Sequence, residues 1–304
     1  MANIVEFLRT YKANDWIKSK FSNENEIARF KSNIVAISNS NELLQKAYPK
    51  TIMTACYQGV LLNLPMERQF GYAYVVPYNT KITRNINGRE IQEWINQAQF
   101  QMGYKGYIQL AQISGQYLDM SVSDVRTGEL VNYDRLKGTS FNWIQNEDKR
   151  EKLSIIGYVA YFKMVNGFEK TLYMTKEQME NHFIKYSKTY AKNKSFYIAS
   201  FDEMALKTVL TSLLRKWGIM SVELQQAYKS DQAVITTNYE KIYIDNDGNV
   251  GKNQGQMSDK TLSNNINSNI IYNEEIVETN DNVVKEEDIS NVVPVNSEDA
   301  FEWA

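Results

Sequence analysis

The sequence predicts an α+β fold in which a small antiparallel sheet is packed by helices and followed by a disordered acidic tail. Two β-rich runs within residues 153–174 are joined by Asn166-Gly167, the pair favoured in type I′ turns, which indicates a hairpin. Apolar residues nearly encircle residues 201–217, which indicates a buried helix. After Tyr228 the chain is rich in Asn, Asp, Glu and Ser, with too few large apolar residues to offset the cost of ordering it.

The first 78 residues are expected to form helices followed by one short strand. Residues 1–30 mix apolar and charged residues and predict a helical arm that packs on the body or on a neighbouring subunit. Asn39 with Glu42 three residues later resembles a capping box that starts a further helix. The run GYAYVVPY at residues 71–78 is aromatic and β-branched, and predicts a strand that Pro77 stops.

The middle of the chain alternates polar and apolar segments. Residues 79–97 are polar and basic and are interpreted as a loop or a mobile hairpin. A helix is expected over residues 100–115, beginning near the glycine-flanked GYKG. Thr175 and Gln178 form a capping box for another helix. Within the tail, IYIDNDGNV at residues 242–250 is expected to form a small hairpin.

The net charge of −2 hides an uneven distribution of charge along the chain. Residues 229–304 carry 5 Lys against 15 Asp and Glu, a net charge of −10. Residues 1–228 therefore carry 29 Lys and Arg against 21 Asp and Glu, a net charge of +8. The sequence thus predicts two parts, a basic body over residues 1–228 that attracts polyanions and an acidic tail over residues 229–304.

Membrane segments and disulfides are not expected. No stretch approaches the roughly 18 apolar residues of a membrane span, and the N-terminal sequence lacks the basic start and apolar run of a signal peptide. We therefore expect a cytoplasmic protein. The single cysteine, Cys56, lies in an apolar helical pattern without a catalytic neighbour, and we expect a buried, inert thiol.

No enzyme site, cofactor site or metal site can be assembled from the sequence. The nearest approach to a phosphate-binding loop is GNVGKNQ at residues 248–254, whose spacing is wrong. Residues 245–248 resemble a calcium loop without its other ligands, and His182 has no partner suited to metal binding. Asp202 and Glu203 are neighbours on a helix, so they point in different directions and favour a role at the helix N-terminus.

Cations alternate with aromatic residues in one segment that follows the second capping box. This run comprises Lys185, Tyr186, Lys188, Tyr190, Lys192, Lys194, Phe196 and Tyr197. Single-stranded nucleic acid favours both residue types, because ammonium groups neutralise phosphates and aromatic faces stack on unpaired bases. The alternative is a solvated basic loop whose aromatic residues anchor it to the core, and the residue pattern leaves both interpretations open.

Four segments in order resemble the RecT family of phage and prophage single-strand annealing recombinases. They are LNLP with GYAYVVPY within residues 62–78, GYKGYIQLAQISGQ at residues 103–116, YVAYFKMVNGFEKTLYMTKEQM at residues 158–179, and FDEMALKTVLTSLLRKWGI at residues 201–219. Together they span roughly residues 50–228. GYKGxIxLAxxSGQ followed by EMAxKT is fairly specific, although it is not a catalytic signature.

The resemblance implies annealing and strand invasion on single-stranded DNA without nucleotide hydrolysis, in the cytoplasm of a bacterial host. It implies a homo-oligomer that forms a ring or helical filament, a partner exonuclease, and contact with the host single-strand-binding protein. Residues 1–228 would then be the DNA-binding and annealing core, with a groove between the sheet and the Lys207 helix that holds DNA.

Carried over residue by residue, the resemblance makes Lys105 of GYKG, Lys207 of EMAxKT and the basic pair Arg215-Lys216 the candidate DNA contacts. Lys188, Lys192, Lys194 and Phe196 join them from the cationic and aromatic run. Relatives often carry a basic pair where this chain has Thr211-Ser212, so that turn contributes less to phosphate binding here. Two alternatives stay open: an architectural DNA- or RNA-binding protein that does not anneal, and a metal-dependent nuclease.

Overall fold

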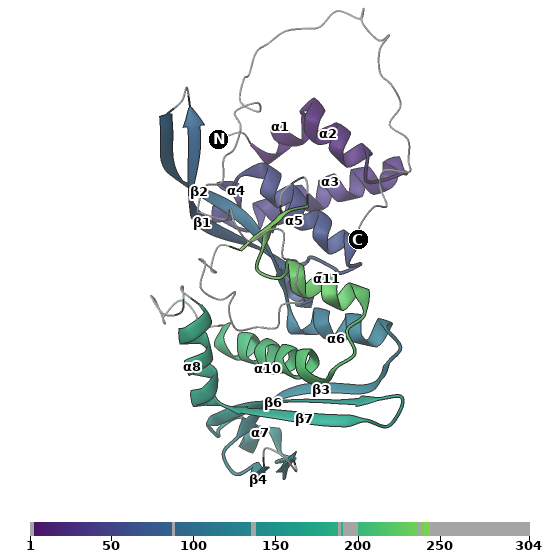
Figure 1. Ribbon diagram of the computed structural model, residues 1–304, viewed down its shortest axis with the longest axis vertical. Helices are drawn as coiled ribbons and strands as arrows, with labels where there is room; N and C mark the ends of the chain where they lie inside the picture. Colours follow the sequence, from purple (N-terminus) through teal and green to yellow (C-terminus); the bar gives the residue numbers. More distant parts are fainter. Residues whose placement is uncertain are drawn as a thin grey trace, which may run out of the picture.

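The computed structural model describes residues 3–86, 89–134, 138–187, 190, 200–235, 237 and 239–243. The described chain has an α+β fold, as the sequence predicts, and is elongated (Figure 1). One end holds the N-terminal helices and a long two-stranded ribbon, and the other end holds a three-stranded antiparallel sheet with its covering helices. No helix in the described ranges has the length and apolar character needed to cross a membrane.

The N-terminal helices pack around one apolar cluster that includes Ile17, Ile34 and Ile52. The arm expected in the first 30 residues is helical and packs on the body, and its Ile17 side chain is fully buried. The expected capping box at Asn39 is wrong, because Asn39 is the last residue of the third helix. The fourth helix is capped by Asn41 instead. The helices are α1 (Ile4–Arg9), α2 (Tyr11–Lys18), α3 (Glu24–Asn39), α4 (Glu42–Gln45) and α5 (Pro49–Leu61).

A short 3-10 helix, η1 (Arg68–Phe70), leads into a long antiparallel ribbon made of β1 (Ala73–Ile86) and β2 (Arg89–Met102). The expectation that Pro77 stops the first strand is wrong, because Pro77 pairs with Ala98 inside the ribbon. A proline lacks an N–H group and is tolerated where a strand has no partner on that side, as on an edge strand. Of the two interpretations of residues 79–97, the hairpin is correct and the loop is not.

The second half of the chain builds a sheet in the order β3-β6-β7, from β3 (Tyr117–Arg126), β6 (Ile155–Met164) and β7 (Glu169–Thr175). One face is covered by α6 (Tyr104–Ile113), α8 (Lys176–Tyr186) and α10 (Phe201–Trp217). The predicted helix over 201–217 is confirmed at both ends, and the predicted capping box of Thr175 and Gln178 begins α8. Helix α6 starts later than expected, because residues 100–102 belong to β2.

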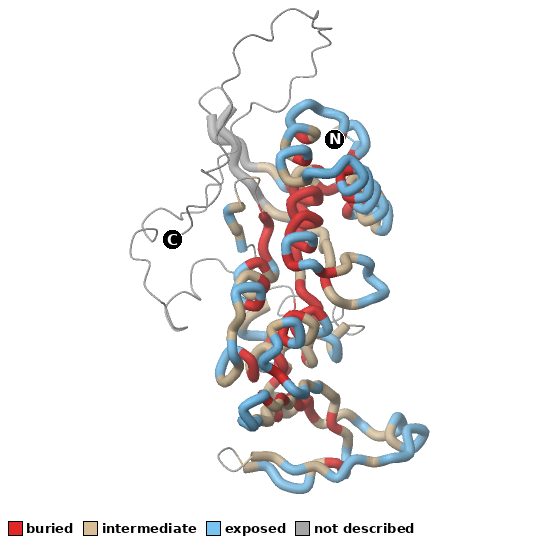
Figure 2. The backbone as a smooth tube through the Cα atoms, turned by 90° about the vertical axis from the view of Figure 1, so that its right-hand side faces the viewer, coloured by how far each residue is buried: buried red, intermediate tan, exposed pale blue. Residues whose placement is uncertain are grey.

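The main core lies between this sheet and the helices. Figure 2 shows buried backbone running through the middle of the molecule from one end to the other. Helix α10 contributes the buried residues Ala205, Val209, Leu210, Leu213 and Leu214 to this core. Burying one such aliphatic side chain contributes roughly 1.5–3 kcal/mol. This dense apolar contact fixes α10 against the sheet.

The turn between β6 and β7 differs from the type I′ turn that the sequence predicts. A type I′ turn needs positive φ at both central residues, but of the Asn166-Gly167 pair only Gly167, with φ of 86°, has it. The Gly167 N–H donates to the Met164 carbonyl, and Asn166 Oδ1 accepts from the Phe168 N–H. The glycine is therefore needed after the tight turn rather than within it.

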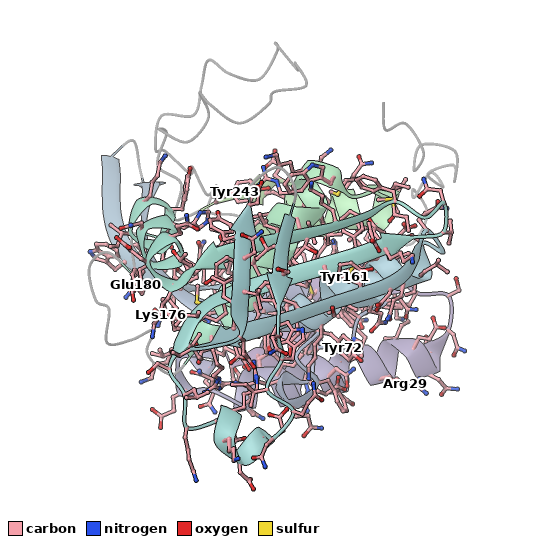
Figure 3. All side chains as sticks on the ribbon, turned by 90° about the horizontal axis from the view of Figure 1, so that it is seen from below. Arg29, Tyr72, Tyr161, Lys176, Glu180 and Tyr243 are labelled. Atoms are coloured by element: carbon pink, nitrogen blue, oxygen red, sulfur yellow. The ribbon has the colours of Figure 1, made fainter. Side chains whose placement is uncertain are left out.

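The outer face of the sheet, which points away from α10, is partly covered by a small hairpin of β4 (Leu130–Asp134) and β5 (Gly138–Phe141), followed by α7 (Glu147–Arg150). Tyr161 lies on this face, and Figure 3 labels it there as seen from below. Two shallow cavities of about 330 and 260 Å³ lie between the hairpin and the sheet and share Tyr161 and Thr171.

The packed core extends past Tyr228. Helix α11 (Val222–Ser230) is followed by β8 (Val234–Ile235) and β9 (Lys241–Ile242), which pair antiparallel. Ala233 bridges Phe100 of β2, and residues 233–235 are at most 2% exposed. The change in composition at Tyr228 therefore lies inside the core rather than at its end. The small hairpin expected at 242–250 falls largely outside the described residues, and Ile242 pairs with Val234 instead.

Candidate nucleic-acid interface

Two glycines place Lys105 at the surface. A Cβ atom on Gly103 would lie 2.0 Å from the Gly71 carbonyl oxygen, and one on Gly106 would lie 2.3 Å from the Tyr72 carbonyl oxygen. Only glycine therefore lets the first turn of α6 approach this backbone so closely. Lys105 lies between the two glycines, and its side chain is exposed. The glycine-flanked pattern GYKG thus has a structural cause.

Lys105 is one member of a small surface cluster of cations and tyrosines. Its aliphatic stem passes Gly71, whose φ of 74° is a conformation that glycine adopts without strain. Burial raises the pKa of the Tyr74 hydroxyl, Glu203 and Tyr104 raise it further, and Arg68 lowers it, so these groups lie near enough to Tyr74 to act on its charge. We call Arg68, Gly71, Tyr74, Tyr104 and Lys105 the Lys105 corner.

The two cations of the Lys105 corner are available for a ligand. Arg68 and Lys105 are both exposed. In the described part of the chain neither has an ion-pair partner within 4.0 Å, whereas Arg126, Arg150 and Lys207 do. An exposed Arg, an exposed Lys and two half-buried tyrosine rings at one place suit a phosphate and an unpaired base.

The ribbon begins at this corner and extends its chemistry. Ala73 and Met102 form the first pair of the ribbon, next to Gly71 and Gly103. Further along, Trp94 is 67% exposed and has Lys81 as its cross-strand partner. The ribbon therefore carries an exposed tryptophan beyond the corner.

Lys207 lies away from this surface. Its side chain is 12% exposed, and its Nζ lies 2.7 Å from Asp231 Oδ2 and 2.9 Å from Asp231 Oδ1. Asp231 also accepts hydrogen bonds from the Met102 N–H at 2.8 Å and the Tyr107 hydroxyl at 3.0 Å. Lys207 does not face an open groove. Its role as a DNA contact stays a prediction that this geometry does not favour.

The groove expected between the sheet and the Lys207 helix does not occur in the described ranges. Helix α10 lies directly on β6 and β7, and apolar side chains such as Val209 and Leu213 fill the space between them. Only four side chains of α10 are exposed, and the other side chains of the helix are buried or partly buried against neighbours. The four are Asp202, Glu203, Arg215 and Lys216. Close packing on all sides excludes DNA from this interface.

Arg215 and Lys216 lie in the last turn of α10 and are exposed. The Arg215 guanidinium lies 5.9 Å from the centre of the Tyr228 ring, and the Lys216 ammonium lies 4.4 Å from the centre of the Trp217 ring. Glu203, which borders the Lys105 corner, is in the first turn of the same helix. The 17 residues of α10 span about 25 Å, so the two basic regions are separate.

The cationic and aromatic run lies mostly outside the described residues. Lys188, Lys192, Lys194 and Phe196 fall there, and their roles as DNA contacts stay predictions. Of the described members, Tyr190 is 5% exposed and packs against Phe183, with the ring centres 5.5 Å apart. Tyr190 thus anchors its segment to the core, as the alternative interpretation of the run expects.

No group of three or more His, Cys, Asp or Glu residues that could hold a metal ion occurs within the described ranges. Asp202 accepts a hydrogen bond of 2.5 Å from the Tyr158 hydroxyl in the first turn of α10. Burial, followed by Lys185 and Arg215, lowers the pKa of His182, which lies over the Tyr186 ring. Cys56 is buried, as expected, and burial raises the pKa of its thiol to about 12.

Sequence reasoning missed Asp231, Arg68 and Tyr74. Asp231 lies in a segment whose composition resembles the acidic tail, so nothing local marks it as the partner of a buried lysine. Arg68 and Tyr74 flank Gly71, and the only sequence signal for them was the set of three glycines in the GY and GYKG segments, Gly71, Gly103 and Gly106. These glycines allow a close contact between the backbones of the two segments, and this contact is seen only in the folded structure.

Known proteins are similar to this chain over much of its length. The chain matches the RecT family over residues 28–245. It is 42% identical over 199 residues to "Uncharacterized protein YqaK" of Bacillus subtilis (strain 168), covering 66% of this chain and 62% of that protein. It is 26% identical over 182 residues to "Protein RecT" of Escherichia coli (strain K12), covering 60% and 62%. The matched part thus spans less than two thirds of each of the two relatives. Because the family match covers most of the chain, the chain belongs to the RecT family.

Proposed function

We propose that this protein binds single-stranded DNA and anneals complementary strands without ATP, in phage-type homologous recombination. Membership of the RecT family supports recombination by strand annealing as the class of activity. The observation that carries the proposal to this chain is the Lys105 corner, where two exposed cations and two tyrosines lie at the base of a ribbon with an exposed Trp94.

The physical basis of annealing on such a surface is simple. Arg68 and Lys105 neutralise phosphates and weaken the repulsion between two DNA strands. Aromatic faces, Trp94 among them, hold bases apart from one another until pairing begins. Pairing of the complementary strand then supplies the free energy, and no covalent step by the protein is involved.

The assembly and partners of the protein are further parts of this proposal. Residues 1–228, together with the packed segment through Ile242 that follows them, form the DNA-binding and annealing core. The chain forms a ring or helical filament on DNA. A partner exonuclease supplies the single strands, and the host single-strand-binding protein is contacted. The protein acts in the bacterial cytoplasm. All of these come from the family resemblance.

A fluorescence annealing assay tests the proposal. Two complementary oligonucleotides that carry a donor and an acceptor dye are mixed with the full chain, with and without ATP. We expect annealing to be faster with the protein, and ATP to change nothing. Binding without acceleration would favour an architectural DNA- or RNA-binding protein. Magnesium-dependent shortening of the oligonucleotides would favour a nuclease.

A further inference from the structure

One end of the sheet carries several exposed apolar residues outside the proposed DNA surface. They are Ile113, Leu118, Val165, Phe168, Ile219 and Val222, with exposed fractions between 41% and 74%. Scattered single apolar residues are ordinary on a protein surface, but a group at one place marks an interaction site. We call these six residues the apolar end.

Specific contacts bring the apolar end together from three connections of the chain. The Val165 N–H donates to the Gln116 carbonyl, which joins the β6–β7 turn to the α6–β3 connection. The Tyr117 hydroxyl donates to the Ile219 carbonyl at 2.9 Å, which joins the same connection to the segment between α10 and α11. The three connections lie near one another in Figure 1.

Cations border the apolar end on the side of α10. The ammonium groups of Lys216 and Lys170 lie 4.4 Å and 5.4 Å from the centre of the Trp217 ring, and Arg215 precedes Lys216. Asp119, next to Leu118, is an exposed acid at this end, whereas two acids on the side of α10 and α11 are held by partners of their own. Glu169 accepts a hydrogen bond from the Tyr161 hydroxyl, and Glu223 is held at the start of α11 by its own N–H and by Ser221. The surface therefore suits a ligand that is both apolar and anionic.

The same chain contains a segment of matching chemistry. Residues 297–304, SEDAFEWA, combine Phe301 and Trp303 with three acids. They belong to residues 244–304, which carry 13 Asp and Glu against 3 Lys. A flexible linker of the 53 residues between Tyr243 and Ser297 would span about 40 Å, so the segment can reach distant parts of its own chain.

We propose that residues 297–304 dock on the apolar end of their own chain. Phe301 and Trp303 cover the exposed apolar residues, and Glu298, Asp299 and Glu302 meet the cations around Trp217. Because the segment is tethered, its local concentration is in the millimolar range, and weak contacts suffice to hold it. The docked segment covers Arg215 and Lys216. This consequence for DNA binding rests on the proposed function, but the docking itself does not.

Disulfide trapping in the full chain tests the docking. The only native cysteine, Cys56, is 2% exposed, and burial raises its thiol pKa to about 12, so it does not compete. Ala300→Cys is combined with Val222→Cys in one variant and with Val131→Cys in a control. Val131 is 65% exposed and Val222 is 74% exposed, but Val131 lies on β4, which covers the opposite face of the sheet.

We expect the Val222→Cys pair to form an intramolecular disulfide roughly tenfold faster than the Val131→Cys pair under mild oxidation at low salt. Adding Phe301→Ser and Trp303→Ser, or Lys216→Glu, should bring the two rates together. Equal rates in the two parent pairs would overturn the proposal. Cross-links found only between chains would also overturn it, because they would place the segment on another copy.

A DNA measurement separates this proposal from the proposed function. The Phe301→Ser, Trp303→Ser variant leaves the described core unchanged and should bind single-stranded DNA several-fold more tightly than the parent at low salt. The difference should shrink as salt screens the charges. If neither the parent nor the Phe301→Ser, Trp303→Ser variant binds DNA, the proposed function fails. The disulfide-trapping rates then still show whether the segment docks. Equal affinities in two DNA-binding proteins would exclude competition between the segment and DNA.

Discussion

The Lys207 ammonium and the Asp231 carboxylate form a close ion pair, with Nζ 2.7 Å from Oδ2 and both side chains almost removed from solvent. Because Asp231 also accepts from the Met102 N–H and the Tyr107 hydroxyl, this pair joins β2, α6 and α10 to the chain after α11. The pair therefore fixes the start of the C-terminal segment that continues into β8.

Lys207→Ala should lower the free energy of unfolding by about 3–5 kcal/mol, because it leaves Asp231 as a buried charge without its cation. The Lys207→Met, Asp231→Leu double variant should recover part of this loss. Lys216→Ala, on the exposed side of the same helix, is the matched control and should unfold like the parent. Urea unfolding measures all of these. A stable Lys207→Ala protein with weak DNA binding would instead return Lys207 to the DNA-contact set.

The elements that the sequence predicts correctly are those specified by neighbouring residues. Helix α10 is recognised from its own apolar periodicity, and α8 from the reciprocal cap of Thr175 and Gln178. The strands β6 and β7 are likewise recognised from their β-branched and aromatic composition. Each of these signals lies within about 20 residues of chain, so no tertiary contact is needed to see it.

The parts that the sequence does not reveal depend on distant contacts. Lys207 looks like a free cation because its partner, Asp231, lies 24 residues further on in an acid-rich stretch. Residues 79–97 of the ribbon resemble a loop in sequence, because strands made of polar residues give only a weak alternation of apolar and polar side chains. Residues 233–235 look like tail, although the bridge from Ala233 to Phe100 places them in the core. Of the described residues that the sequence proposes as DNA contacts, Lys105, Arg215 and Lys216 are exposed, and their roles stay predictions.

Gly106→Ala should have two effects at once: it should destabilise the protein, and it should displace the Lys105 corner. The new Cβ would lie 2.3 Å from the Tyr72 carbonyl oxygen, so the first turn of α6 must move, at a cost of roughly 1–3 kcal/mol. Gln112→Ala, exposed near the end of the same helix, is the control. Thermal unfolding and DNA affinity are measured together, and an unchanged melting temperature for Gly106→Ala would contradict the close contact.

Lys105→Ala should weaken binding to single-stranded DNA while leaving the unfolding free energy unchanged. The side chain is exposed, so its loss removes a phosphate contact rather than a core contact. The slope of log K against log[salt] should become less negative by about 0.7. Lys149→Ala on α7, at the far end of the molecule, controls for net charge. Equal affinity and equal slope in both variants would remove Lys105 from the interface.

Glu129 should make the free energy of unfolding depend on pH in the acidic range. Burial raises the pKa of its carboxyl group, but hydrogen bonds from Arg150 and from the Arg126 and Ile144 N–H groups outweigh burial, and the pKa in the folded state is lowered. A carboxyl group whose pKa is lowered by folding contributes stability at pH values above its pKa in the unfolded chain, about 4.3. This stability is lost as the pH falls through its pKa in the folded protein.

Glu129→Gln should therefore be less stable than the parent at neutral pH, and the difference should narrow as the pH falls below about 4. Urea unfolding at several pH values measures it. Glu147→Gln, an exposed acid in the first turn of α7, is the control and should show a small difference at every pH. A loss of stability in Glu129→Gln that does not change with pH would assign it to packing instead of charge.

Trp94→Ala tests whether the ribbon takes part in DNA binding. The side chain is 67% exposed, so its removal should leave the melting temperature unchanged. If the ring stacks on an unpaired base, affinity for single-stranded DNA should fall by about 1–3 kcal/mol, and Trp94→Phe should retain most of it. Tyr11→Ala, 82% exposed on α2, is the matched aromatic control and should bind like the parent. Fluorescence anisotropy with a dye-labelled oligonucleotide measures the affinities. Equal affinity of Trp94→Ala and Tyr11→Ala would confine the interface to the Lys105 corner, because an exposed tryptophan that contacts a base cannot be removed without cost.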